Sequence, residues 1–126
     1  MAGAGTSPVR VLHVDDNIEF ADTAAAFLER ADPRFRVETT ASVATALEEL
    51  ADSTPDCIVS DYNMPGRDGI EFLRAVREEF PDLPFILFTG KGSEAIASEA
   101  ISAGVTDYLQ KESTTEQYTL LANRIE

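Results

Sequence analysis

Short apolar segments alternate along this chain with longer segments that have a helical spacing of apolar residues. The short segments are VRVLHVD, RVETT, DCIVSD, PFILFT and VTDYLQ, at residues 9–15, 36–40, 56–61, 84–89 and 105–110. The first, third and fourth are apolar nearly throughout, which is typical of strands covered on both faces. We predict a β-strand at each of the five.

Between these segments, apolar residues recur at intervals of three and four, which predicts an amphipathic helix after each strand. In chain order the residues that carry this pattern are Phe20, Ala24, Phe27 and Leu28; Val43, Leu47 and Leu50; Ile70, Leu73, Val76 and Phe80; Ile96, Ala100 and Ile101; and Tyr118, Leu121 and Ile125. Helix-start signals support three of the helices: Ser42 before the second, Asp68 with Glu71 at the third, and Ser113 with Glu116 at the fifth. Five strand–helix repeats predict a doubly wound α/β sandwich around a central five-stranded parallel sheet.

The pattern predicts one domain over residues 9–126, preceded by a flexible lead at residues 1–8. The lead, MAGAGTSP, has neither the basic nor the apolar region of a secretory signal. The helical pattern still continues at Glu126 without a Gly or Pro stop, which suggests a fragment cut from a longer protein. No apolar run approaches the roughly 20 residues of a membrane span, and a single cysteine, Cys57, excludes an internal disulfide. A cytoplasmic protein is expected, with Cys57 as a small buried hydrophobic residue.

The charge is strongly acidic, at −13 from 23 acidic and 10 basic residues, and only Lys91 and Lys111 are lysines. Such a surface repels nucleic acid and anionic membranes, so direct binding to either is not expected. An excess of acids with few lysines resembles the composition of proteins from salt-loving archaea, where high ionic strength screens the self-repulsion. The composition therefore predicts a halophilic source.

Polar side chains come at the ends of four predicted strands, where ligands of an open parallel sheet bind. They are Asp15 and Asp16 after the first strand, Asp61 after the third, Thr89 after the fourth and Lys111 after the fifth. Each also has an ordinary structural explanation, since Asp16–Asn17 could cap the first helix and Asp61 or Thr89 could begin a turn. Three acids at one edge repel one another unless a cation lies among them. Mg²⁺, or Mn²⁺ in its place, is the expected ion, because it prefers oxygen ligands.

Asp61 is the acid that we expect to react. It ends a strand, and Pro65-Gly66 in the following loop keeps the backbone clear of it. A carboxylate can attack phosphorus to give an aspartyl phosphate. Mg²⁺ and Lys111 would neutralise the added charge, the Thr89 hydroxyl would donate a hydrogen bond to it, and Gly90 leaves room for it. These residues predict phosphorylation of Asp61.

From about Val9 to Ile125 the chain resembles the receiver domains of two-component response regulators, the CheY-like family. The resemblance rests on VDD after the first strand, DYNMPGRDG after the third, Thr89 after the fourth, and AGVTDYLQK leading to Lys111. It implies a flavodoxin-like (βα)5 fold and a signalling switch. In such a switch Asp61 accepts a phosphoryl group from a sensor histidine kinase or phosphotransfer protein. It also implies no enzymatic activity beyond the protein's own phosphorylation and dephosphorylation.

The resemblance further implies a metal site. Asp16 would hold Mg²⁺ directly and Asp15 largely through water, with Asp61 and the backbone carbonyl of Asn63 as the other ligands. One departure concerns Glu112, which stands after Lys111 where the family usually has Pro, often with a cis bond. A cis bond before a non-proline residue costs about 2.5–4 kcal/mol, so this peptide is predicted to be trans.

The resemblance also implies a switch pair, Thr89 and Tyr108. The hydroxyl would move toward the phosphate and the ring would turn inward. This change would remodel the surface of the fourth helix, fifth strand and fifth helix, where an output domain or protein docks.

Two other functions remain open. A receiver that has lost phosphorylation could serve as a docking domain, although the intact set of site residues argues against it. An aspartyl-phosphate phosphatase of another fold would have D-x-D after the first strand, whereas here Asp15 and Asp16 are adjacent.

TGKGS around Lys91 fails as a phosphate-binding loop because Phe85 replaces the first glycine. His13, inside the first strand, is expected to be a packed core histidine rather than a phosphoacceptor or metal ligand.

Overall fold

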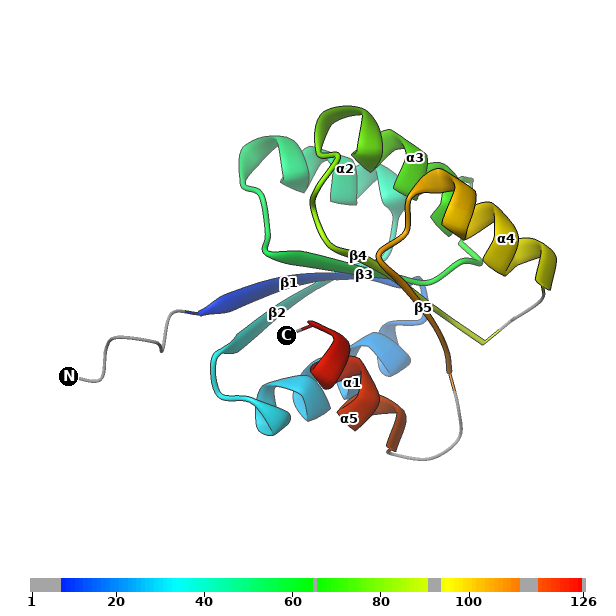
Figure 1. Ribbon diagram of the computed structural model, residues 1–126. Helices are drawn as coiled ribbons and strands as arrows, with labels where there is room; N and C mark the ends of the chain where they lie inside the picture. Colours follow the sequence, from blue (N-terminus) through cyan, green and yellow to red (C-terminus); the bar gives the residue numbers. More distant parts are fainter. Residues whose placement is uncertain (1–7, 65, 91–93, 112–115, 126) are drawn as a thin grey trace.

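The computed structural model describes residues 8–64, 66–90, 94–111 and 116–125. Within these residues, five parallel strands form one sheet in the order β2-β1-β3-β4-β5, and a helix follows each strand (Figure 1). The elements are β1 Val9–Val14, α1 Ile18–Ala31, β2 Phe35–Thr40, α2 Val43–Asp52, β3 Cys57–Ser60, α3 Gly69–Glu79, β4 Phe85–Thr89, α4 Glu94–Ala103, β5 Asp107–Gln110 and α5 Glu116–Ile125. The predicted doubly wound α/β sandwich is confirmed.

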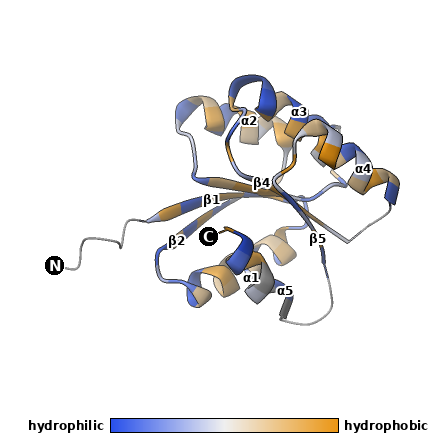
Figure 2. Cartoon of the chain, viewed as in Figure 1, coloured by the Kyte–Doolittle hydropathy of each residue, from blue (hydrophilic) through white to orange (hydrophobic). Residues whose placement is uncertain are grey.

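Helices cover both faces of the sheet, α1 and α5 on one side and α2, α3 and α4 on the other (Figure 1). Because side chains of a strand alternate between its faces, each central strand contributes to two cores. Leu12 and Leu87 belong to the core under α2, α3 and α4, while Val11 and Phe88 belong to the core under α1 and α5. Figure 2 shows the matching hydropathy, with hydrophobic residues along β1 and β4 and in bands on the helices.

Capping residues set the starts of three helices. The Asn17 side chain accepts a hydrogen bond from the Phe20 amide at α1, and the Ser42 side chain accepts one from the Thr45 amide at α2. Asp68 and Glu71 form the predicted capping box at α3. Ser113, the predicted cap of the fifth helix, lies outside the described residues.

One predicted core residue is exposed. Ile101 in α4 was grouped with Ile96 and Ala100, but its exposed fraction is 71%. Ile96 and Ala100 are one helical turn apart and face the core, and the next residue, Ile101, is rotated by about 100° away from Ala100.

The strand ends agree with the prediction to within one or two residues, as for β5, which begins at Asp107 rather than at 105.

Candidate functional site

Three carboxylates lie together at the carboxyl edge of the sheet. β1 and β3 are neighbours with Val14 opposite Ser60, so the next residues, Asp15 and Asp61, emerge side by side. The Asp61 amide donates to the Val14 carbonyl at 2.9 Å, which fixes this alignment. Asp15, Asp16 and Asp61 each offer a carboxylate oxygen, and these atoms lie within 4.8 Å of one another. Asp15 and Asp61 are buried and Asp16 is exposed.

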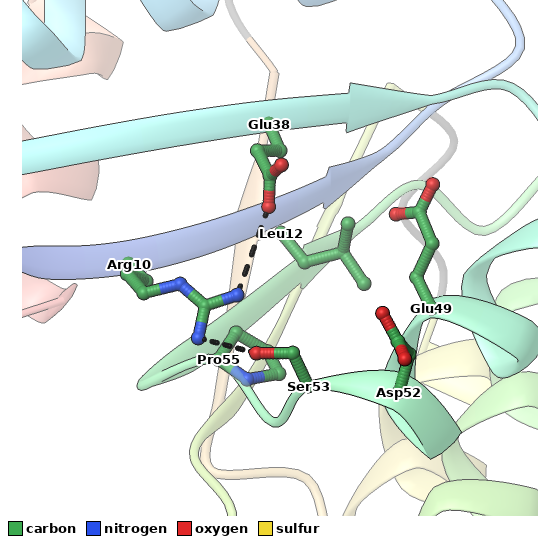
Figure 3. A pocket seen from close by; sticks show the side chains of 7 residues that line it. All are labelled: Arg10, Leu12, Glu38, Glu49, Asp52, Ser53 and Pro55. Atoms are coloured by element: carbon green, nitrogen blue, oxygen red, sulfur yellow. Dashed lines mark hydrogen bonds and ion pairs between the residues drawn. The ribbon is translucent and has the colours of Figure 1, made fainter.

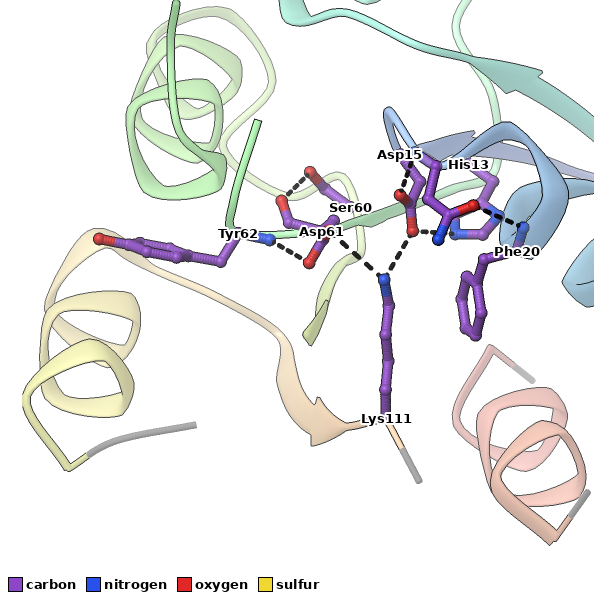
Figure 4. A network of polar contacts seen from close by, with 8 residues as sticks. His13, Asp15, Phe20, Ser60, Asp61, Tyr62 and Lys111 are labelled. Atoms are coloured by element: carbon purple, nitrogen blue, oxygen red, sulfur yellow. Dashed lines mark hydrogen bonds and ion pairs between the residues drawn. The ribbon is translucent and has the colours of Figure 1, made fainter. Parts of the chain in front are cut away.

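The predicted lysine reaches this cluster from β5. The Lys111 amide donates to the Thr89 carbonyl at 2.8 Å, which holds Lys111 beside the carboxyl end of β4. The ammonium nitrogen lies 2.8 Å from Oδ2 of Asp15 and 3.3 Å from Oδ2 of Asp61 (Figure 4). It also lies 4.1 Å from the centre of the Phe20 ring, an attractive cation–π contact. One ammonium therefore bridges two of the three acids.

Backbone amides orient the two buried carboxylates. Oδ1 of Asp15 accepts a hydrogen bond from the Asn17 amide at 2.9 Å, and Oδ1 of Asp61 accepts one from the Tyr62 amide at 2.8 Å. In both residues this leaves Oδ2 directed at Lys111 (Figure 4). Among the described residues, three carboxylates face one ammonium, which leaves a local excess of negative charge. An all-oxygen donor set with that excess fits a hard divalent cation such as Mg²⁺.

The remaining predicted site residues lie near this edge in different environments. Thr89 is buried at the end of β4, and Asn63 is exposed in the loop two residues after Asp61. Tyr108 pairs with Leu87 across β4 and β5, and its ring packs on the core under α2, α3 and α4. Within the described residues its buried hydroxyl has no hydrogen-bond partner. Lys91 and Glu112, singled out in the sequence, lie outside the described residues.

Residues 11–123 match the family model of the response regulator receiver domain. The chain belongs to this family. The C4-dicarboxylate transport transcriptional regulatory protein DctD of Rhizobium meliloti is 34% identical over 116 residues, which cover 92% of this chain and 25% of DctD. The chain therefore spans a quarter of the length of that relative.

Solved structures of other receivers are similar along nearly the whole chain. The Vibrio cholerae chemotaxis protein CheY4 superposes with a TM-score of 0.85 at 30% identity, covering 95% of this chain and 100% of CheY4. The beryllofluoride-activated receiver domain dimer of NtrC4 gives a TM-score of 0.82 at 30% identity, covering 92% of this chain and 94% of that one. The predicted family and its CheY-like fold are confirmed.

His13 of this receiver is buried behind the acid cluster, as expected of a core histidine. Burial, and to a smaller extent the nearby Lys111 ammonium, lower its pKa from 6.5 to about 4, while Asp61 acts in the opposite direction. Its ring packs edge-on against Phe20, with ring centres 6.3 Å apart. Its Nε2 lies 4.0 Å from Oδ2 of Asp15 (Figure 4). Sequence reasoning missed this proximity, although the alternation of β1 places residues 13 and 15 on one face.

A separate cavity of about 220 Å³ lies beside α2, toward the amino ends of β1 and β3 (Figure 3). Its lining includes Arg10, Glu38, Glu49 and Asp52. The Arg10 guanidinium donates to Ser53 Oγ at 2.8 Å and lies 3.8 Å from Glu38. Arg10 is thus engaged by other residues of the protein, and none of the described lining residues belongs to the acid cluster.

No helix in the described part of the receiver is both long and apolar enough to cross a membrane.

Proposed function

We propose that this receiver domain, over residues 9–126, is a phosphorylation switch whose phosphoacceptor is Asp61. The observation that supports it best is the position of the Asp61 carboxylate. One of its oxygens is held by the Tyr62 amide, and the other lies 3.3 Å from the Lys111 ammonium. Two further acids, Asp15 and Asp16, lie beside it.

The proposed chemistry is phosphoryl transfer from a phosphohistidine of a sensor kinase or phosphotransfer protein. A carboxylate oxygen of Asp61 attacks phosphorus, a P–O bond forms as the P–N bond breaks, and the leaving imidazole takes a proton from water. Lys111 neutralises the charge that arrives with the phosphoryl group. Hydrolysis of the acyl phosphate by water then resets the switch, and no further catalytic activity is proposed.

Asp15, Asp16, Asp61 and the backbone carbonyl of Asn63 would hold Mg²⁺. When bound, the ion supplies positive charge to the oxygens of the transferring phosphoryl group. No hydrogen bond or ion pair within the described residues involves the exposed carboxylate of Asp16, whereas both oxygens of Asp15 are engaged. Of these two acids, we therefore assign direct ligation to Asp16, with Asp15 acting largely through water.

A Mg²⁺ titration followed by tyrosine fluorescence tests the metal assignment. Asp16→Ala should weaken Mg²⁺ binding by about tenfold or more, because one of the few charged ligands is lost. Asp22→Ala, which removes an exposed acid of α1, is the matched control and should bind like the wild type. Equal affinities for the Asp16 variant and the wild type would contradict the direct role.

We further propose that Thr89 and Tyr108 carry the signal to α4, β5 and α5, where an output domain or protein would dock. A phosphoryl group attracts the Thr89 hydroxyl only by hydrogen bonding, and this movement changes the space open to the Tyr108 ring. The buried hydroxyl of Tyr108 has no partner within the described residues, so another ring position that satisfies it would be close in free energy. Phosphorylation then changes the free-energy difference between the two states by about 1–3 kcal/mol, which shifts their populations.

Amide NMR spectra with and without beryllofluoride, in the presence of Mg²⁺, test the switch. The wild type should show shift changes through β5, including Tyr108. Thr89→Ser keeps the hydroxyl and should behave like the wild type, whereas Thr89→Ala should bind beryllofluoride with a much smaller change at Tyr108. A full response in the Thr89→Ala variant would contradict this route. A wild type that ignores both beryllofluoride and phosphodonors would favour a docking domain that works without phosphorylation.

A further inference from the structure

The imidazole of His13 is an unsatisfied polar group beside the phosphorylation site. Its side chain is fully buried, and within the described residues neither ring nitrogen has a hydrogen-bond partner. Buried polar groups without partners are rare in folded proteins, because their lost hydration is not replaced. Oδ2 of Asp15 lies 4.0 Å from Nε2, which is beyond hydrogen-bond range.

Among the described residues, a single neighbouring cation balances the negative charge on Oδ2 of Asp15. Its side chain is fully buried, Oδ1 accepts from the Asn17 amide, and Oδ2 accepts from Lys111. The same ammonium already lies 3.3 Å from Asp61. A phosphoryl group on Asp61 adds negative charge there, so it draws the ammonium toward itself and away from Asp15. Oδ2 of Asp15 would then be a buried anionic oxygen that has lost its donor.

We propose that His13 is a positioning residue whose Nε2–H donates to Oδ2 of Asp15 when Lys111 moves to the phosphorylated Asp61. This inference rests on the proposed function. It needs the Nε2-to-Oδ2 distance to shorten by about 1 Å, to the usual range of such hydrogen bonds. A neutral imidazole with its proton on Nε2 is sufficient, so the ring need not change its charge. The edge-on contact with Phe20 fixes the ring while Asp15 approaches it.

Direct ligation of a metal by His13 explains the geometry less well. Among the described residues, the group whose ligand atoms lie within 4.8 Å of one another contains Asp15, Asp16 and Asp61 but not His13. In addition, the oxygen that Nε2 approaches is the one already bonded to Lys111. The arrangement is that of a donor held behind a carboxylate.

Two variants separate a hydrogen-bonding role from a packing role. His13→Phe keeps a ring in the apolar pocket without a donor, and His13→Gln offers an amide N–H at a similar distance along the side chain. In the presence of Mg²⁺, His13→Phe should bind beryllofluoride about tenfold more weakly than the wild type, because a charge-assisted hydrogen bond is lost. His13→Gln should recover most of this affinity. Binding of Mg²⁺ alone should change less than about twofold in both, since Lys111 still serves Asp15 in that state.

Imidazole ¹⁵N NMR of the wild type gives a second readout that needs no variant. On adding beryllofluoride, Nε2 of His13 should take the shift of a protonated, hydrogen-bonded nitrogen, and its proton should exchange slowly with water. The inference is overturned if both variants bind beryllofluoride like the wild type, if they weaken it equally, or if the Nε2 signal does not respond. A wild type that binds no beryllofluoride and accepts no phosphate would instead overturn the proposed function, and this inference with it.

Discussion

The ammonium nitrogen of Lys111 lies 2.8 Å from Oδ2 of Asp15, a carboxylate whose side chain is fully buried. A charge in the interior is stable only with a partner, so this ion pair links the end of β5 to the end of β1. Asp61 receives the same ammonium at 3.3 Å. The lysine is therefore already in position for the phosphoryl group that we propose Asp61 accepts.

Replacing Lys111 by Met should destabilise the metal-free receiver. Two buried acids would lose their shared cation, and the free energy of unfolding should fall by about 2–4 kcal/mol. Urea denaturation at neutral pH with a chelator measures this loss. Lys111→Arg keeps the charge and should lose less, and Mg²⁺ should restore part of the stability of Lys111→Met. If the Lys111→Met variant were as stable as the wild type without metal, the ion pairs of Lys111 would make no net contribution to the free energy of unfolding.

Among the glycines that the structure describes, Gly69 leaves the least room for a side chain, and it lies beside Asp61, the proposed phosphoacceptor. A Cβ atom there would overlap the Asp61 carbonyl oxygen and lie 2.9 Å from both Leu87 Cδ1 and the Tyr62 Cα atom. We expect Gly69→Ala to cost about 1–3 kcal/mol and to slow phosphorylation by about tenfold or more, because the backbone of Asp61 must shift.

Gly90→Ala is the matched control for stability, since among the described atoms its Cβ would meet only Lys111 Cδ, at an ordinary 3.9 Å. Thermal melts compare the two variants, and phosphorylation time courses compare Gly69→Ala with the wild type. Equal melting temperatures of the two variants, with wild-type phosphorylation of Gly69→Ala, would mean that the backbone of Asp61 shifts without cost.

Much of this architecture could be predicted from the sequence, because parallel strands buried on both faces appear as continuous apolar runs. The order of strands and helices then requires that Asp15, Asp61, Thr89 and Lys111 meet at one edge. The orientation of Ile101 could not be predicted, because Ile96 and Ala100 also fit a helical face that includes it. Which of these residues the sheet buries is decided by tertiary packing.

The contacts beneath the acid cluster could not be predicted from the sequence either. Phe20 was assigned to the core, and nothing in its spacing predicted that its ring would lie 4.1 Å from the Lys111 ammonium. His13 was assigned to packing, yet its ring nitrogen faces Asp15. Such contacts join β1, α1 and the end of β5, and their distances depend on how these elements pack.

Cys57 should be unreactive in the native receiver. Burial, with a smaller effect of Asp56, raises the pKa of its thiol from 9.0 to about 12. Because the thiolate is the reactive form, labelling by a disulfide reagent at pH 8 should follow the rate of unfolding. Fast labelling under native conditions would show that β3 opens locally.

The same pKa shift links Cys57 to stability at high pH. The unfolded thiol ionises above pH 9 while the folded thiol stays neutral, so stability is lost as pH rises from about 9 to about 12. The stability lost in this way amounts to about 1.4 kcal/mol at pH 10. Cys57→Val should abolish this loss of stability. If the stability of the two proteins depended on pH in the same way between pH 8 and 10, this explanation would be contradicted.

The acidic charge should make stability depend on salt. With a net charge of −13, repulsion between carboxylates grows in dilute buffer, where the Debye length is tens of ångströms, and falls in molar KCl, where it is about 3 Å. The melting temperature should therefore rise with KCl. Replacing the exposed acids Asp22 and Asp52 by Lys should flatten this dependence. A melting temperature indifferent to salt would argue against adaptation to high salt.

The most direct test of the switch is the intact mass of the receiver after incubation with Mg²⁺ and acetyl phosphate. The wild type should gain one phosphoryl group, and omitting Mg²⁺ should prevent the gain. Asp52→Asn, which alters an exposed acid of α2, should be labelled like the wild type. Asp61→Asn should remain unlabelled, because its amide oxygen is a far weaker nucleophile than the carboxylate. Labelling of the Asp61→Asn variant to the same extent as the wild type would contradict the assignment of Asp61 as the phosphoacceptor.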